Sequence, residues 1–273
     1  HRCGYGVISV RKRTWLLVGL ALLWSLMPVR VWGVSTSASA AVLMDADTGQ
    51  VLFDHNGGQR MLIASTTKIM TALVALERAS PTDVITVKQE HMTEGSSMYL
   101  KPGERVTVEE LLYGLLLCSG NDAAEALADG CGGTASFVRR MNGLAGELGM
   151  EDTVFCNCTG LPAEGHHASA YDIALMSREL ILRHPDIRTY TTIWMDTLRD
   201  GQFQLSNTNK LIRFYEGATG LKTGSTDSAR YCISATAERE GMELIAVVLK
   251  SPTGQQRFED AKTLLNYGFS TYG

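Results

Sequence analysis

Runs of β-forming residues stand at both ends of this chain, and the sequence between them is mainly helical in pattern. The β-rich runs are residues 40–45, 50–54, 219–223, 231–237 and 244–250. Ala46-Asp47-Thr48-Gly49 joins the first two with the composition of a hairpin turn, and Glu238-Arg239-Glu240-Gly241 joins the last two. Strands from both ends can share one antiparallel sheet. The pattern therefore predicts an α/β (α+β) fold in which helices flank that sheet.

The middle of the chain shows the apolar spacing of amphipathic helices. The expected helices cover about residues 65–78, 108–117, 122–129, 137–148 and 170–182, with a last helix at 256–267. The 273 residues are 45% hydrophobic and 20% charged, which suffices for one large domain or two closely packed lobes. The sequence shows no internal repeat and no linker.

Three short strings carry functional groups suited to one kind of chemistry. They are Ser65-Thr66-Thr67-Lys68, Ser119-Gly120-Asn121 and Lys222-Thr223-Gly224. Each string alone is weak, because a helix-capping Ser, a glycine turn and a solvated strand end give the same letters. Their joint presence, in the order that serine acyl-transfer enzymes use, is specific. Together they indicate acyl transfer through a serine ester.

Ser65 and Lys68 are the expected nucleophile and general base. We expect Ser65 to open a helix, where first-turn N–H groups lack partners and the helix dipole favours negative charge. Lys68 follows three residues later and projects from the same face. Partial burial near other cations lowers the pKa of a lysine, so the neutral amine can take the Ser65 proton.

The second string falls between two expected helices, where a glycine turn can point both flanking side chains into a cleft. Ser119 is the expected proton relay to the leaving amine. Asn121 is expected to hold a substrate amide through both its N–H and its C=O group.

The third string is expected on a strand that borders the same cleft. Lys222 and Thr223 supply a positive charge and a donor for a terminal carboxylate on the substrate. Gly224 has no side chain, so a peptide can lie against the strand. The backbone N–H groups of Ser65 and Ser225 are the two expected oxyanion donors.

Longer stretches around the strings follow one known pattern. They are residues 63–71, 95–98 with 100–104, 119–123 and 220–226. On these stretches the chain resembles the low-molecular-weight penicillin-binding D-alanyl-D-alanine carboxypeptidases, peptidase family S11, over roughly residues 39–272. The resemblance implies a β-lactamase/transpeptidase-like fold, with a mainly helical lobe inserted and the active site between lobe and sheet. It also implies removal of the terminal D-Ala from peptidoglycan stem peptides ending in D-Ala-D-Ala, and acylation of the same serine by β-lactams.

The chain departs from that family in two places. Members often continue into a β-rich second domain and a C-terminal amphipathic anchor, whereas this chain stops at Gly273. We expect residues 34–273 to form the peptidase domain, without a C-terminal β-rich domain in this chain, which is either truncated or lacks both parts. In Asn157-Cys158-Thr159-Gly160-Leu161, Cys158 stands near the place of a common Pro. The loop is expected to differ locally without loss of a catalytic role.

Two other functions stay open at this point. A class A serine β-lactamase shares the three strings but needs a Glu-x-x-x-Asn loop, and neither Glu151 nor Glu164 has an Asn four residues later. A catalytically silent penicillin sensor would keep the fold without turnover. Sustained penicillin hydrolysis would indicate the first, and absence of D-Ala release the second.

The first 33 residues differ in composition from the rest. Arg11-Lys12-Arg13 precedes an apolar run over 15–27, which is shorter than the ~20 residues of a membrane span. We expect residues 1–33 to be a secretory signal peptide; an uncleaved anchor, the alternative, would be the sole membrane contact. Removing their five basic residues leaves 20 Lys and Arg against 29 Asp and Glu, a formal charge of −9. Such a charge disfavours nucleic-acid binding and suits a soluble exported enzyme. The family resemblance implies a bacterial enzyme of the cell wall or of the outer face of the cytoplasmic membrane.

Cysteine and histidine spacing indicates neither a disulfide framework nor a metal site. Five cysteines lie beyond the first 33 residues: Cys118, Cys131, Cys156, Cys158 and Cys232. A bridge between Cys156 and Cys158 would be strained, and the five lack zinc-finger spacing. We expect most to be small buried residues, and we assign Cys118 no role. The histidines form no His-Glu-x-x-His array, and no metal or cofactor is expected.

Overall fold

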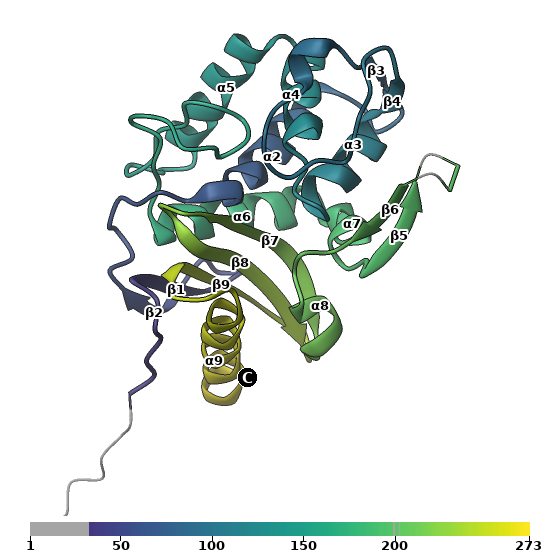
Figure 1. Ribbon diagram of the computed structural model, residues 1–273. Coiled ribbons are helices and arrows are strands. Elements are labelled where there is room, and N and C mark those ends of the chain that lie inside the picture. The colour runs from purple at the N-terminus through teal and green to yellow at the C-terminus, as the bar shows by residue number, and fades with distance from the viewer. Residues whose placement is uncertain (1–32, 199, 202) are drawn as a thin grey trace, which may run out of the picture. The chain divides into compact units, whose positions relative to one another are not determined.

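The central sheet has five antiparallel strands in the order β2-β1-β9-β8-β7 (Figure 1). The strands are β1 (Ala40–Asp45), β2 (Val51–His55), β7 (Ala218–Thr226), β8 (Arg230–Arg239) and β9 (Met242–Ser251). β1 pairs with β2 on one side and with β9 on the other. Strands from distant parts of the sequence thus meet inside one sheet, which confirms the sheet predicted from the two β-rich ends.

The structure is a computed structural model that describes residues 33–198, 200–201 and 203–273. Ser35–Gly273 forms one compact unit. The predicted signal peptide lies outside the described residues, apart from Gly33. Within the described residues, no helix has both the length and the apolar character of a membrane span.

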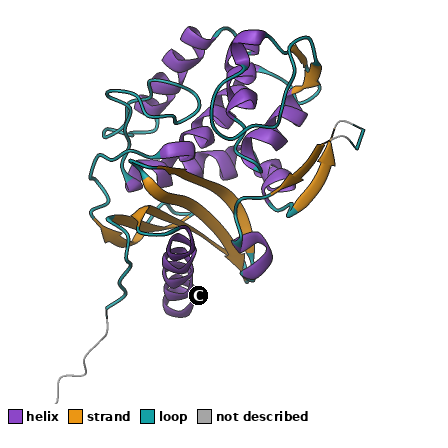
Figure 2. Ribbon diagram, viewed as in Figure 1, coloured by secondary structure: helices purple, strands orange, loops and turns teal. Residues whose placement is uncertain are grey.

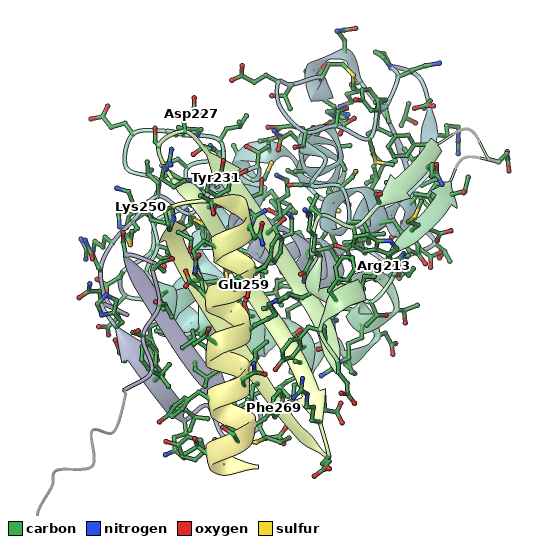
Figure 3. The ribbon with its side chains drawn as sticks, turned by 60° about the horizontal axis from the view of Figure 1, so that its bottom comes forward. Arg213, Asp227, Tyr231, Lys250, Glu259 and Phe269 are labelled. Carbon is green, nitrogen blue, oxygen red and sulfur yellow. The ribbon has the colours of Figure 1, made fainter. Side chains whose placement is uncertain are left out.

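Helices cover both faces of the sheet, so its inner strands carry apolar side chains on both sides. α9 (Gly254–Tyr272) lies over one face of the sheet (Figure 3). There Gly268 packs closely against Leu43 and Leu244. α6 (Ala170–Arg183) lies against the other face. There the hydroxyls of Ser177 and Ser234 are hydrogen-bonded at 2.7 Å.

A mainly helical lobe is inserted between β2 and β7 (Figure 2). Its main helices are α2 (Lys68–Arg78), α3 (Val108–Leu116), α4 (Asn121–Gly130) and α5 (Thr134–Glu147). α2 lies at the centre, with residues 68–75 buried. α3 begins with a capping box between Thr107 and Glu110, each side chain accepting from the other's backbone N–H. Each predicted helix is present, although the last runs on to Tyr272 instead of ending at 267.

Short elements complete the fold, and the sequence did not predict them. Two hairpins stand apart from the central sheet: β3 (Val84–Thr86) with β4 (Arg105–Thr107), and β5 (Met195–Leu198) with β6 (Phe203–Ser206). The short helices are η1 (Ala64–Thr67), η2 (Gln89–His91), η3 (Pro185–Ile187), α7 (Arg188–Thr191) and α8 (Leu211–Phe214). Elements of three or four residues are too short to show a periodic pattern.

Candidate active site

Ser65 lies in a tight turn that leads into α2. The turn is the 3-10 helix η1, and the α-helix begins only at Lys68. The helix predicted over about residues 65–78 is present, and its first turn, which contains Ser65, is 3-10 in form. Ala64 takes the left-handed conformation, with φ of +50°, and the Thr66 hydroxyl donates back to the Ile63 carbonyl at 2.6 Å. Both features tighten the first turn, and such backbone strain is common at functional sites.

Two glycines let other segments pack directly on this turn. A Cβ at Gly224 of β7 would lie 2.6 Å from the backbone nitrogen of Ser65. A Cβ at Gly160 would lie 2.0 Å from the carbonyl oxygen of Ala64, and Gly160 has φ of +87°. The absent side chain of Gly224 therefore serves close packing of β7 against the nucleophile. The predicted contact of a peptide with Gly224 stays a prediction.

Lys68 is fully buried, and its side-chain nitrogen has three oxygen partners. Nζ lies 2.8 Å from Ser65 Oγ, 2.7 Å from Asn121 Oδ1 and 2.8 Å from the carbonyl oxygen of Thr159. Burial lowers the pKa of Lys68 to about 7, although nearby acidic groups such as Asp122 oppose that shift. Near neutral pH, a large fraction of Lys68 is therefore a neutral amine in contact with the Ser65 hydroxyl.

Asn121 begins α4 and connects Lys68 to a neighbouring loop. Its Oδ1 accepts from Lys68, and its Nδ2 donates to the carbonyl oxygen of Glu94 at 2.8 Å. Its backbone N–H donates to the carbonyl of Ser96 at 2.7 Å. The structure thus shows Asn121 fixing the position of Lys68. The predicted grip on a substrate amide stays a prediction, and both ends of the Asn121 amide already have protein partners.

Ser119 occupies the turn between α3 and α4. It is 7% exposed and takes the left-handed conformation, with φ of +61°. Gly120 and Asn121 follow it directly, so Ser119 stands beside the partner of Lys68. Within the described residues, its hydroxyl makes no hydrogen bond, which leaves its proton available. Its relay role stays a prediction.

Asp122 holds the loop over residues 96–100 against the second string. Its carboxylate accepts from the Ser97 hydroxyl at 2.7 Å and from the backbone N–H groups of Met98 and Leu100, each at 3.0 Å. An acidic residue in the first turn of α4 is also favoured by the helix dipole. One side chain therefore fixes this loop along the wall of the site.

Lys222 and Thr223 lie on β7, one of the two edge strands of the central sheet. Lys222 is 1% exposed, and its Nζ donates to the carbonyl oxygen of Thr223 at 2.6 Å. Burial, and next the positive charge of Lys68, lower the pKa of Lys222 well below its ordinary value. Ser225, further along the strand, is exposed. The contacts of Lys68 with Asn121 and of Gly224 with Ser65 show that the three strings meet.

The loop over residues 156–160 contributes to the site, and the sequence analysis missed its part. The Thr71 hydroxyl of α2 donates to the carbonyl oxygen of Cys158 at 2.7 Å. The next carbonyl, of Thr159, accepts from Lys68, and Gly160 then packs on Ala64. Because these contacts use backbone oxygens, side-chain patterns in the sequence give no signal for them.

His166, which the sequence analysis left without a role, is bonded to the nucleophile turn, which is η1 with Ser65 in it. Its Nδ1 accepts from the backbone N–H of Cys156 at 2.9 Å. The hydrogen of the neutral ring is therefore on Nε2, which lies 2.9 Å from Thr67 Oγ1 and donates to it. Burial, and next the charge of His167, lower the pKa of His166 to about 4, so the ring is neutral at physiological pH.

Arg257 of α9 is a second residue that the sequence analysis missed. Its Nη1 donates to the carbonyl oxygens of Gly224 at 3.2 Å and of Cys232 at 3.4 Å. Its guanidinium lies over the rings of Tyr231 and Phe258, and Tyr231 is labelled in Figure 3. Arg257 therefore adds positive charge behind the third string.

The five described cysteines are free thiols. Cys131, Cys158 and Cys232 are buried, whereas Cys156 is exposed. Burial raises the pKa of the Cys118 thiol to about 11, so it is protonated near neutral pH. In the part of the chain that the structure describes, no group of His, Cys, Asp and Glu side chains is arranged to hold a metal ion.

Comparison with known proteins identifies the family. A family model described as D-alanyl-D-alanine carboxypeptidase, peptidase S11, matches residues 28–253. The chain belongs to peptidase family S11. The S11 relative DacF of Bacillus subtilis, a D-alanyl-D-alanine carboxypeptidase, is 43% identical over 246 residues. That match covers 86% of this chain and 63% of DacF, so the chain spans less than two thirds of that relative's length.

Solved structures agree with the S11 assignment. The Streptomyces K15 DD-transpeptidase superposes with a TM-score of 0.82 at 32% identity, over 86% of this chain and 98% of that one. The ampicillin-bound penicillin-binding protein D2 of Listeria monocytogenes superposes with a TM-score of 0.80 at 34% identity. That match covers 87% of this chain and 99% of the Listeria chain. The predicted β-lactamase/transpeptidase-like fold is thereby confirmed.

Proposed function

We propose that this S11 protein is a serine-type D-alanyl-D-alanine carboxypeptidase that removes the terminal D-alanine from peptidoglycan stem peptides. One observation carries the proposal: Lys68 Nζ lies 2.8 Å from Ser65 Oγ, and burial lowers the pKa of that lysine to about 7. A nucleophile in contact with a base whose pKa is near neutral pH is what acyl transfer requires. The family and the named activity of relatives such as DacF support the same reaction.

The partners of Lys68 orient it as the general base. A neutral amine has two hydrogens and one lone pair. Asn121 Oδ1 and the Thr159 carbonyl accept the two hydrogens, so the lone pair faces the Ser65 hydroxyl. Lys68 takes the Ser65 proton as Ser65 Oγ attacks the carbonyl carbon of the penultimate D-Ala. The backbone N–H groups of Ser65 and Ser225 serve as the oxyanion hole in this proposal.

Collapse of the tetrahedral intermediate breaks the C–N bond and leaves an ester on Ser65. The departing amine of D-Ala takes up a proton, which Ser119 relays from Lys68. Water then attacks the ester, Lys68 takes the water proton, and Lys68 returns that proton to Ser65 Oγ as this oxygen leaves the acyl carbon. The position of Ser119 beside Asn121, which bonds Lys68, supports this assignment.

The third string serves as the substrate clamp in this proposal. β7 is an edge strand, so its outer backbone groups can pair with an extended peptide that passes Gly224. Lys222 and Thr223 receive the terminal carboxylate, and Asn121 contacts the substrate amide. A bound carboxylate beside Lys222 opposes the effects that lower its pKa and so favours its charged form.

β-Lactams are covalent inhibitors in this proposal, because they present a strained amide and a carboxylate to the same groups. The ampicillin-bound Listeria protein supports this expectation. The formal charge of −9 beyond residue 33 argues against a nucleic-acid partner. We place the enzyme outside the cytoplasm, where peptidoglycan lies, with any membrane contact made through an uncleaved N-terminal segment.

Mass spectrometry of a stem pentapeptide after incubation with the protein tests the reaction. Loss of one alanine is expected, and an unchanged pentapeptide would contradict the proposal. Penicillin should add its mass to the protein as a stable ester; sustained penicillin hydrolysis would instead indicate a β-lactamase. Added glycine identifies the acceptor: a product carrying glycine in place of D-Ala would show transpeptidation, the activity named for the Streptomyces neighbour.

A further inference from the structure

The hydroxyl of Thr208 is hydrogen-bonded to the hydroxyl of Thr223, a residue of the third string. The two Oγ1 atoms lie 2.6 Å apart. Thr223 is 4% exposed, whereas Thr208 is exposed. Thr208 follows β6 and belongs to none of the three strings, so the sequence analysis did not select it.

The backbone holds Thr208 firmly in this place. Its N–H donates to the carbonyl oxygen of Leu117, just before the second string, at 3.0 Å. Thr208 therefore connects the second string to the third.

The two flanking asparagines are buried and add further bonds. Asn207 Nδ2 donates to the carbonyl oxygens of Thr191 and Ile193, at 3.1 and 2.9 Å. Asn209 Nδ2 donates to the Gly220 carbonyl on β7 at 2.9 Å. The segment thus presents the Thr208 hydroxyl from a fixed backbone.

The direction of the bond between the two hydroxyls matters for an anionic ligand. Each hydroxyl has one hydrogen, and a carboxylate has none to donate. If Thr223 donates to Thr208, its only hydrogen is used and it cannot donate to a carboxylate. If Thr208 donates to Thr223, the Thr223 hydrogen stays free, and a hydroxyl that accepts one bond becomes a better donor in the next.

We propose that Thr208 is a positioning residue for carboxylate recognition: its hydroxyl donates to Thr223 and so reserves the Thr223 hydrogen for the terminal carboxylate of the substrate. This inference rests on the proposed carboxypeptidase function. It assigns to Thr208 a role that acts through Thr223 and not through direct contact with the reacting atoms.

Steady-state kinetics of Thr208→Val test the proposal, since valine has the shape of threonine without the hydroxyl. The loss of one neutral hydrogen bond should lower kcat/KM for the pentapeptide by about 5- to 10-fold. The effect should appear in KM, because the carboxylate is bound equally in the ground state and the transition state. Thr208→Ser keeps the hydroxyl and should stay within about 2-fold of the wild type.

A double-mutant cycle with Thr223→Val separates this role from a structural one. Thr208→Val should add almost nothing once Thr223 has lost its hydroxyl. On a peptide that ends in an amide, Thr208→Val should have no effect. Thr263→Val, an exposed threonine on α9 whose hydroxyl bonds the Glu259 carbonyl, is the matched control. Thr208→Ala replaces Thr208→Val if circular dichroism shows that the valine variant is unfolded.

The inference is overturned if Thr208→Val matches the wild type, if the two substitutions add, or if Thr208→Ser is as defective as Thr208→Val. These outcomes leave the proposed function intact, because the wild-type protein still releases D-Ala. A wild type that releases none contradicts the proposed function itself.

Discussion

Lys68 is an ionisable residue in a place where positive charge is costly. It is fully buried, and its Nζ bonds a hydroxyl, an amide oxygen and a backbone carbonyl; among the described residues, no carboxylate is hydrogen-bonded to it. Neutral partners offset only part of the desolvation cost of an ammonium group, so the population of the neutral amine rises. A buried lysine with these partners is built to exchange protons.

Ser65→Ala should abolish D-Ala release and covalent penicillin labelling together. The substitution removes one oxygen from a half-buried position, so the fold should be retained. Labelling is measured by intact-protein mass spectrometry, with circular dichroism as the check on folding. Labelling that survives the substitution would show that another residue is the nucleophile.

The rate of penicillin acylation should follow the protonation of Lys68. Only the neutral amine can accept the Ser65 proton, so the rate should fall about tenfold per pH unit below pH 7 and level off above it. Stopped-flow acylation by a fluorescent penicillin between pH 5 and 9 measures this profile. Lys68→Arg, which stays protonated, should be slower by about 10²- to 10⁴-fold throughout, with the surface change Lys262→Arg as control. A flat profile for the wild type would argue against Lys68 as the base.

At the scale of elements, the nucleophile turn lies between two segments that pack against it so closely that neither has room for a Cβ at the contact. β7 reaches it at Gly224, and the loop over residues 156–160 reaches it at Gly160. The same loop places the Thr159 carbonyl against Lys68. The position of that loop and the orientation of the catalytic amine are therefore coupled.

Gly160→Ala should destabilise the protein and slow acylation, because a Cβ there would lie 2.0 Å from a backbone oxygen. We expect the free energy of unfolding to fall by about 3 kcal/mol. Gly165→Ala, five residues further along the chain, is a matched control, because Gly165 has φ of +86° and its added Cβ would have its nearest neighbour, Cys156 Sγ, at 3.8 Å. It should cost about 1 kcal/mol, the conformational penalty alone. Urea unfolding measures both, and equal losses would show that packing against the turn is not the cause.

The elements that the sequence predicted are the long ones. Strands such as β1 and β9 are apolar over their length because helices cover both faces, and that composition is visible in the sequence. The hairpin β5–β6 has strands of four residues with alternating exposure, and a pattern so short does not stand out.

In the site, the three strings were recognisable from their side chains. Thr159 and Thr208 were not, since one acts through its carbonyl and the other through contacts that only the folded chain creates.

At the scale of the whole molecule, the loop that carries His166 is joined to the helical core by a neutral imidazole. Its ring packs edge-on against Phe155, and its two nitrogens bond Cys156 and Thr67. A second proton on the ring would have to occupy Nδ1, which faces a backbone N–H. Protonation therefore opposes the folded state.

The free energy of unfolding should fall as the pH falls from 6.5 to 4. The pKa of His166 is about 4 in the folded state, so over this window the unfolded chain binds a proton that the folded chain does not. The loss amounts to at most about 3 kcal/mol. In His166→Gln this contribution is absent, so the stability gap between wild type and variant should narrow towards pH 4. Urea unfolding at pH 4.5, 5.5 and 7 measures the gap, and a gap that stays constant would falsify the assignment.

The position of β9 has a consequence for the order of assembly. It lies between β1 and β8, although it is the last of the five strands to leave the ribosome. Until β9 has been made, β1 and β8 have no common neighbour. The apolar sides of α6 and α9 then have no complete sheet to pack against. Pairing between strands that are so far apart in the sequence is slow. The central sheet of a nascent chain with this topology is incomplete until β9 has been made, and an incompletely folded polypeptide is the state that can be threaded through a translocation channel.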